Sequence, residues 1–124
     1  MTVETGDTEI KPVTEFIHAG FIKPLEKRLC SDFAKPSPIQ SQCWPIILCN
    51  RDLIGIAQTG SGKTLAFGAP GLMLCAKTKM NPIQPCMAVL APTRELAIQI
   101  GEVPEKVRHT AMTKVANRTG GVFK

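Results

Sequence analysis

Apolar residues recur at helical spacing in the first part of the chain. After Pro24, the residues Leu25, Leu29 and Phe33 fall on one face of a short amphipathic helix. The next segment, 35–40, holds two prolines and is expected to form a structured loop. A second helix is predicted over 39–49, because apolar residues return there at helical spacing.

Two continuous apolar runs, 52–57 and 86–91, are typical of buried strands, and 114–117 forms a last extended stretch. Helices are predicted after the first two runs, over 63–75 and over 92–103. Strands alternating with helices indicate an α/β domain with a parallel sheet and flanking helices. Three strands make only a part of such a sheet.

The bulk composition of the 124 residues, 44% hydrophobic and 20% charged, is that of one small globular domain. A net charge of +5 is compatible with a polyanionic partner such as RNA, although the excess is mild. The stretch 1–14 is polar and carries three carboxylates, which is unlike a secretory signal and predicts a flexible lead-in. No run approaches the roughly 18 to 20 apolar residues that cross a bilayer, so no membrane partner and an intracellular location are expected.

The five cysteines are odd in number, and no two of them form a CxxC pair. This spacing argues against a zinc site and against a disulfide framework. We therefore expect reduced thiols that act as small buried hydrophobic side chains. They are Cys30, Cys43, Cys49, Cys75 and Cys86.

The run AQTGSGKT at 57–64 matches the phosphate-loop pattern, with alanine in place of the first glycine. Gly60 and Gly62 would let successive backbone N–H groups point at phosphate oxygens. Lys63 would reach the β and γ phosphates, and the Thr64 hydroxyl would hold Mg²⁺, which makes these two the candidate catalytic residues. The predicted phosphate contacts of an ATP site are Ala57, Gln58, Thr59, Gly60, Ser61, Gly62, Lys63 and Thr64. The alternative is a glycine-rich turn with an incidental lysine.

A phosphate loop alone does not choose between kinases, GTPases, transporters and helicases. The flanking sequence reads FAKPSPIQ at 33–40, followed by Trp44 and Pro45, then PTRELA at 92–97 and a glycine pair at 120–121. In order and spacing these runs resemble the Q motif, motif I, motif Ia and GG element of DEAD-box ATP-dependent RNA helicases. The resemblance covers about 13–124 and implies the N-terminal part, over 15–124, of a RecA-like domain of the P-loop NTPase type, with a partial parallel sheet.

The resemblance implies how an ATP base would be held. The Gln40 amide can donate and accept at once, so it can pair with the N6 and N7 edge of adenine. Phe16 matches the family's isolated aromatic that packs on the adenine face. The alternatives are a core role for Phe16 and a helix N-terminal polar role for Gln40. Phe33 is expected to pack the loop.

The resemblance also implies an RNA-binding surface that grips the sugar-phosphate backbone and is indifferent to sequence. Thr93 can cap the following helix, and Arg94 can meet a phosphate. The alternative is a plain helix start with Thr93 as N-cap and with Arg94 and Glu95 solvated. The candidate RNA contacts are Pro92, Thr93, Arg94, Glu95, Gly120 and Gly121.

The family's Asp-Glu-Ala-Asp sequence does not occur, and the last aspartate is Asp52. The resemblance assigns Mg²⁺ binding and water activation to that sequence. We therefore expect a truncated helicase core with an unpaired sheet edge and without helicase-rate hydrolysis. Three functions stay open: the ATP- and RNA-binding part of an RNA helicase of the nucleus or cytoplasm, a non-catalytic module that binds RNA or a protein partner, and an unrelated phosphate-loop kinase or GTPase.

Overall fold

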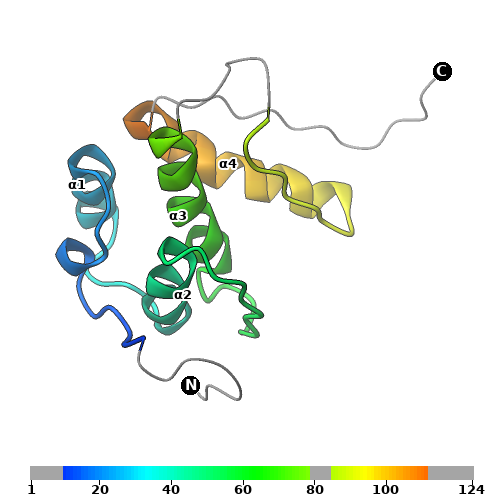
Figure 1. Ribbon diagram of the computed structural model, residues 1–124. Helices are drawn as coiled ribbons and strands as arrows, with labels where there is room; N and C mark the ends of the chain where they lie inside the picture. Colours follow the sequence, from blue (N-terminus) through cyan, green and yellow to red (C-terminus); the bar gives the residue numbers. More distant parts are fainter. Residues whose placement is uncertain (1–9, 79–84, 112–124) are drawn as a thin grey trace.

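The computed structural model describes residues 10–78 and 85–111, with side chains placed as far as Glu102 (Figure 1). Helix α3 is the central element: α2 and α4 pack against it, and α1 packs against α4. None of the helices in the described part is long and apolar enough to cross a bilayer. The elements are the 3-10 helix η1 (Phe16–His18) and the helices α1 (Lys23–Asp32), α2 (Pro38–Leu48), α3 (Lys63–Lys77) and α4 (Arg94–Ala111).

Helix α1 confirms the amphipathic helix predicted after Pro24, which lies at its N-terminus, where its missing N–H costs nothing. Leu25 and Leu29 are fully buried, as their spacing predicts. Phe33 departs from the prediction, because it follows the last helical residue in an extended conformation and its side chain is 46% exposed. Leaving the helix turns this side chain away from the face that Leu25 and Leu29 share.

Helix α2 confirms the second predicted helix and begins one residue earlier, at Pro38. Its tryptophan, Trp44, is completely buried at the centre of the main core, where Phe21 meets it edge-on at 4.9 Å between ring centroids. The helix ends before Asn50, whose positive φ of 57° is a conformation that asparagine tolerates well. Most of the core therefore forms where α2, α3 and the N-terminal helices meet.

Helix α3 has 15 residues and runs two residues beyond the predicted 63–75. Gly68, Pro70 and Gly71 lie inside it, although glycine and proline are poor helix formers. Gly68, Ala69 and Pro70 are buried, so packing against neighbouring helices offsets their low propensity. Small residues also let a helix lie close to its neighbours at the centre of the fold.

The predicted strands are not present in the described part of the chain. Segments 52–57 and 86–91 run as irregular backbone (Figure 1), and most of their apolar residues are exposed, whereas Ala57 and Ala91 are half-buried. Ile54 is 92% exposed, Ile56 93% and Leu90 95%. A strand gains its backbone hydrogen bonds from a neighbouring strand, so an apolar run without a partner stays irregular. The helices that follow these segments are present, although α4 spans Arg94–Ala111 and continues through Pro104, where the sequence predicted its end. The partial parallel sheet is not confirmed, and the stretch 114–117 lies outside the described residues.

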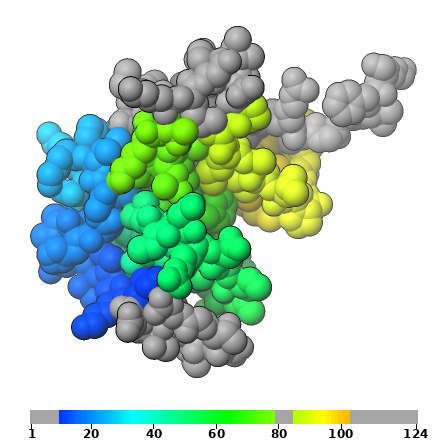
Figure 2. Space-filling model, in the orientation of Figure 1, coloured from blue at the N-terminus to red at the C-terminus, as the bar shows by residue number. Residues whose placement is uncertain are grey.

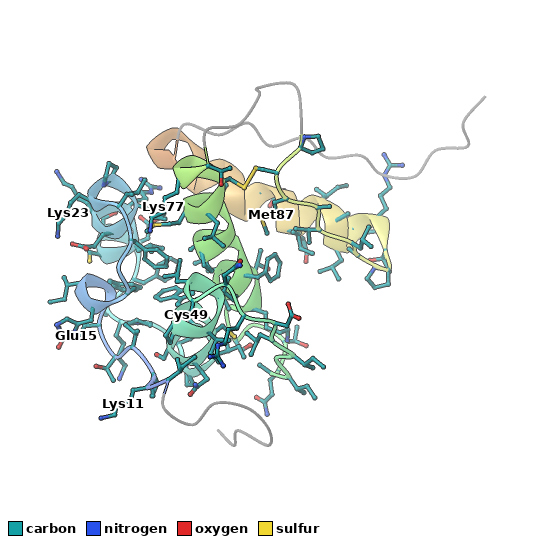
Figure 3. The ribbon with its side chains drawn as sticks, viewed as in Figure 1. Lys11, Glu15, Lys23, Cys49, Lys77 and Met87 are labelled. Carbon is teal, nitrogen blue, oxygen red and sulfur yellow. A yellow bond between two sulfur atoms is a disulfide. The ribbon has the colours of Figure 1, made fainter. Side chains whose placement is uncertain are left out.

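The expectation of five reduced, buried cysteines is wrong. Cys75 and Cys86 form a disulfide, whose yellow bond is visible in Figure 3. Of the free cysteines, Cys30 and Cys49 are exposed and only Cys43 is buried. The absence of a CxxC pair could not reveal a disulfide between residues that the fold brings together.

The predicted lead-in, 1–14, is described only from Ile10 onward. Within it, the Val13 N–H donates to the Ser41 carbonyl at 2.9 Å, and the Val13 side chain packs against the main core. The end of this segment is therefore attached to α2.

Candidate nucleotide-binding site

The glycine-rich loop ends at the N-terminus of α3. Gly60 and Gly62 have φ angles of 76° and 85°, the left-handed conformation that side-chain-bearing residues avoid. The Ser61 N–H donates to the Gln58 carbonyl at 3.3 Å and closes a tight turn. Gly62 is the N-cap of α3 and has no side chain with which to cap the helix. The first N–H groups of α3, with the positive end of its dipole, are thus available to an anion.

Lys63 folds back over the loop that precedes it. Its ammonium donates to the Gln58 carbonyl at 2.8 Å and also to the Ala57 carbonyl. The side chain is exposed, and Thr64 beside it is half-buried. The ammonium therefore lies at the loop. Its hydrogen bonds go to backbone carbonyl oxygens, which take the place of the phosphate oxygens of a nucleotide.

Gln40 connects α2 to the loop. Its amide nitrogen donates to the Gly62 carbonyl at 3.2 Å, and its amide oxygen accepts the Ser37 N–H at 2.9 Å. The second contact is the helix N-terminal role that the sequence left open for this residue. A primary amide has two N–H groups and two acceptor lone pairs, so one of each remains for a ligand.

Two buried hydroxyl groups lie near the loop: the Ser61 hydroxyl has no hydrogen-bond partner among the described residues, and the Ser37 hydroxyl faces the Gln40 backbone N–H in the capping box of α2. A Cβ atom placed on Gly62 would lie 3.2 Å from the Ser37 oxygen, so this hydroxyl adjoins the loop. Buried polar groups without partners are rare in folded proteins. The Ser61 hydroxyl is therefore a group of the loop that a bound ligand could satisfy.

Trp44 fixes α3 relative to α2. Its indole N–H donates to the Leu65 carbonyl at 3.1 Å, in the first turn of α3. Trp44 lies one helical turn after Gln40, so both side chains extend from the same face of α2 toward the start of α3. This supporting role is absent from the sequence prediction, in which Trp44 serves only as a family marker. The signal was the spacing of four residues between the two.

Phe16 is 4% exposed and lies in the main core, 5.8 Å from Trp44 between ring centroids. This is the core role that the sequence left open. Phe16 also borders a cavity of about 440 Å³ together with Lys35, which belongs to the segment that precedes α2. The cavity is lined by Thr14, Glu15, Phe16, Ile17, Cys30, Ala34 and Lys35.

The candidate RNA contacts lie at the start of α4. The Thr93 hydroxyl accepts the Leu96 N–H at 3.3 Å, a hydrogen bond of the N-cap type. The side chains of Arg94 and Glu95 are exposed. The structure thus contains the plain helix start that the sequence allowed, with its charged side chains accessible. The glycine pair at 120–121 lies outside the described residues.

The described part of the chain holds no group of three or more His, Cys, Asp or Glu residues that could bind a metal by themselves. A metal ion at the loop would therefore need ligands from a bound phosphate in addition to Thr64.

Comparison with known proteins gives one family throughout. Residues 37–123 match the model of the DEAD/DEAH box helicase family. The ATP-dependent RNA helicase dbp3 of Aspergillus niger is 41% identical over 121 residues, which are 96% of this chain and 24% of that protein. DEAD-box ATP-dependent RNA helicase 20 of Oryza sativa subsp. japonica is 46% identical over all of this chain and 26% of its own length. This chain thus spans about a quarter of these relatives.

Two solved structures share the fold. The RNA helicase Prp28 of Chaetomium thermophilum, bound to ADP, superposes with a TM-score of 0.79 and 37% identity, covering 89% of this chain and 28% of that one. A DEAD box protein of Methanococcus jannaschii gives a TM-score of 0.67 and 29% identity over 78% of this chain and 26% of that one. The arrangement of helices around the glycine-rich loop is thus one found in proteins of this type.

Proposed function

The chain belongs to the DEAD/DEAH box helicase family, and on that premise we propose that it is the ATP- and RNA-binding portion of an ATP-dependent RNA helicase that unwinds or remodels RNA. One observation carries the proposal: a glycine-rich loop ends at the uncapped N-terminus of α3 and is held there by the Gln40 amide. The proposed domain is 15–124, part of a RecA-like domain inside the nucleus or cytoplasm. Segments 52–57 and 86–91 become strands when neighbouring strands cover them.

The phosphates of ATP bind the backbone N–H groups of the loop and the start of α3, as the helix dipole favours. Lys63 leaves the carbonyls of Ala57 and Gln58 and pairs with the β and γ phosphates, while the Ser61 hydroxyl gains the partner it lacks. Thr59 contributes its backbone to the same cradle. Mg²⁺, when bound, neutralises charge on the phosphates, and the Thr64 hydroxyl is its protein ligand.

The adenine base uses the remaining donor and acceptor of Gln40. Phe16, which the family resemblance assigns to the adenine face, borders a cavity of about 440 Å³ whose lining does not include Gln40. Supporting an adenine site, the related Prp28 structure holds ADP. An amide that donates and accepts on one edge matches adenine and mismatches guanine, so the proposal includes selectivity for ATP over GTP.

RNA binds through its sugar-phosphate backbone at the start of α4. The Arg94 side chain pairs with a phosphate, and the backbone N–H groups of Thr93 and Arg94 are further donors. Glu95 and the pair Gly120 and Gly121 complete the surface. Charge-assisted contacts of this kind are indifferent to base sequence and weaken as salt rises.

The alternative is a module that binds RNA or a protein partner without hydrolysis. The observation in its favour is that no Asp-Glu-Ala-Asp sequence occurs. The side chains of Glu95 and Glu102, two of the three carboxylates after the phosphate loop, are exposed on α4. We expect this chain alone to bind ATP without turning it over at a helicase rate.

The test compares ATP with GTP binding by titration with fluorescent analogues. ATP is expected to bind at least about tenfold more tightly, which is the value of one lost bidentate base contact. Lys63→Ala should abolish ATP binding, whereas Lys77→Ala, at the other end of α3, should leave it unchanged. Equal affinity for the two nucleotides would reject the proposed contact between Gln40 and the adenine base. RNA-stimulated hydrolysis that Lys63→Ala abolishes would reject the non-catalytic alternative.

A further inference from the structure

The disulfide joins the end of α3 to the segment that precedes α4. Helix α3 begins at the proposed nucleotide site, and the start of α4 is the proposed RNA site. Cys75 lies half-buried in the last turn of α3, and Cys86 is exposed in the segment before α4. Their Cα atoms are 5.9 Å apart, well within the range that a disulfide spans. Figure 2 shows the yellow segment that leads to α4 lying beside the end of α3.

Little else attaches the segment 85–91 to the helices. Its residues are exposed except for the half-buried Ala91, and among the described residues no backbone hydrogen bond joins this segment to a helix. One packing contact supports it: the Met87 side chain lies against Gly71 of α3 so closely that a Cβ atom there would collide with the sulfur. Cys86 and Met87 also close one side of an apolar cavity of about 410 Å³, lined further by Ile47, Phe67, Gly71, Leu74, Cys75 and Thr78.

We propose that Cys75 and Cys86 are a reversible redox modification site, whose oxidation attaches segment 85–91 to the end of α3 and whose reduction releases it. Cys86 is an exposed residue and so can be reached by small oxidants and thiols, and exposed disulfides are the labile ones. Cys86 is therefore the residue that reacts first, and Cys75 is the one that resolves the product.

The chemistry with a peroxide balances. The Cys86 thiolate attacks one peroxide oxygen and becomes a sulfenic acid, with hydroxide leaving. The Cys75 thiolate then attacks that sulfur, forms the S–S bond and expels a second hydroxide. Two thiols supply two electrons, and one hydrogen peroxide becomes two waters. A dithiol reverses the step by attacking the Cys86 sulfur and expelling the Cys75 thiolate.

The consequence follows from the connectivity. Helix α3 begins at the phosphate loop, and segment 85–91 leads directly to Pro92 and α4, which already packs against α3. Oxidation therefore limits how far the start of α4 can move relative to α3. That this start contacts RNA rests on the proposed function, whereas the disulfide and its effect on 85–91 do not.

The experiment compares chain reduced by a dithiol with chain treated with hydrogen peroxide. Titratable thiols in denaturant should fall from five to three, since Cys30, Cys43 and Cys49 are the free cysteines. Trypsin should then release peptide 64–77 covalently joined to peptide 80–94, because Lys63, Lys77, Lys79 and Arg94 are cleavage sites. Cleavage within 86–91 by a protease of broad specificity should be about tenfold slower in the oxidised chain, because a segment fixed at Cys86 adapts less readily to a protease site.

Two variants keep the result interpretable. Cys86→Ser should retain the fold and lose both the cross-linked peptide and the redox-dependent protection from proteolysis. The double variant Cys30→Ser, Cys49→Ser removes the exposed free thiols and should behave as the parent chain. Five thiols after peroxide, cross-links through Cys30 or Cys49, or a disulfide that leaves the rate of proteolysis within 86–91 unchanged would each overturn the proposal. ATP binding is measured in the same samples, so a chain that forms the disulfide and binds no ATP rejects the proposed function alone.

Discussion

Replacing Gly62 by alanine should be more damaging than the same change at Gly60, although the two glycines share a left-handed backbone. Their φ angles, 85° and 76°, cost an alanine about 1–2 kcal/mol each. A Cβ atom on Gly60 meets nothing within 4 Å, whereas one on Gly62 lies 2.5 Å from the amide nitrogen of Gln40. The amide must move, and it makes hydrogen bonds to Ser37 and to Gly62 itself.

Losing those two hydrogen bonds costs about 0.5–1.5 kcal/mol each. We therefore expect Gly60→Ala to lower the free energy of unfolding by about 1–2 kcal/mol and Gly62→Ala by about 2–5 kcal/mol. Urea titration followed by circular dichroism measures both values. Gly20→Ala is the matched control, since its φ is 74°, it has nothing within 4 Å of a Cβ atom and it lies outside the loop.

Nucleotide binding separates backbone strain from displacement of the amide. Gly60→Ala should weaken ATP and GTP equally, because it alters the phosphate cradle alone. Gly62→Ala should in addition reduce the preference for ATP, because Gln40 no longer presents its amide edge in the same place. Gly20→Ala should leave binding unchanged. If Gly62→Ala and Gly60→Ala lose equal stability and equal selectivity, the contact between Gln40 and the loop has no role in the site.

Three further predictions concern the core and the surface. Trp44→Ala should lower the free energy of unfolding, measured by thermal or urea melts, by about 3–5 kcal/mol. Trp44→Phe should lower it by about 1–2 kcal/mol, because the Leu65 carbonyl loses its indole donor. Equal losses would mean that packing contributes nothing beyond the hydrogen bond. Burial raises the pKa of the Cys43 thiol, so iodoacetamide at neutral pH should alkylate Cys43 more slowly than the two exposed free cysteines. Peptide mass spectrometry measures the rates, and an equal rate would contradict the burial of Cys43. Aspartate at both Ile54 and Ile56 should change the free energy of unfolding by no more than about 0.5 kcal/mol for each substitution, and it should reduce self-association measured by light scattering. A large loss of stability would show that these side chains are buried in solution.

The helices could be predicted from the sequence because their signals are local. Proline at the first helical positions and apolar spacing set the start and the buried face of α1 and α2. The strands could not be established in the same way. An apolar run indicates that a segment is suited to burial, but the element that covers it lies elsewhere in the sequence. Ile54 and Leu90 satisfy the pattern and yet face solvent.

In the candidate site, too, the features with local signals could be predicted and the contacts between elements could not. The order of glycines and lysine predicts a phosphate loop, and the left-handed angles at Gly60 and Gly62 agree with the use of glycine there. The contacts of Gln40 with Gly62 and of Trp44 with Leu65 depend on how α2 packs on α3, which no local pattern specifies. The pairing of two cysteines across α3 and the next segment is hidden from the sequence for the same reason.

The phosphate loop keeps a defined shape although the segment before it is irregular, and the reason lies in α2. In a parallel sheet, the preceding strand would hold one end of the loop. Here Gln40 holds the loop at Gly62, and Trp44 holds the first turn of α3 from the buried core. Both contacts come from one face of one helix, so the position of the loop depends on α2 and α3 packing together. Nucleotide binding by this chain should therefore follow the stability of that helix pair, and substitutions in 52–56 should affect it little.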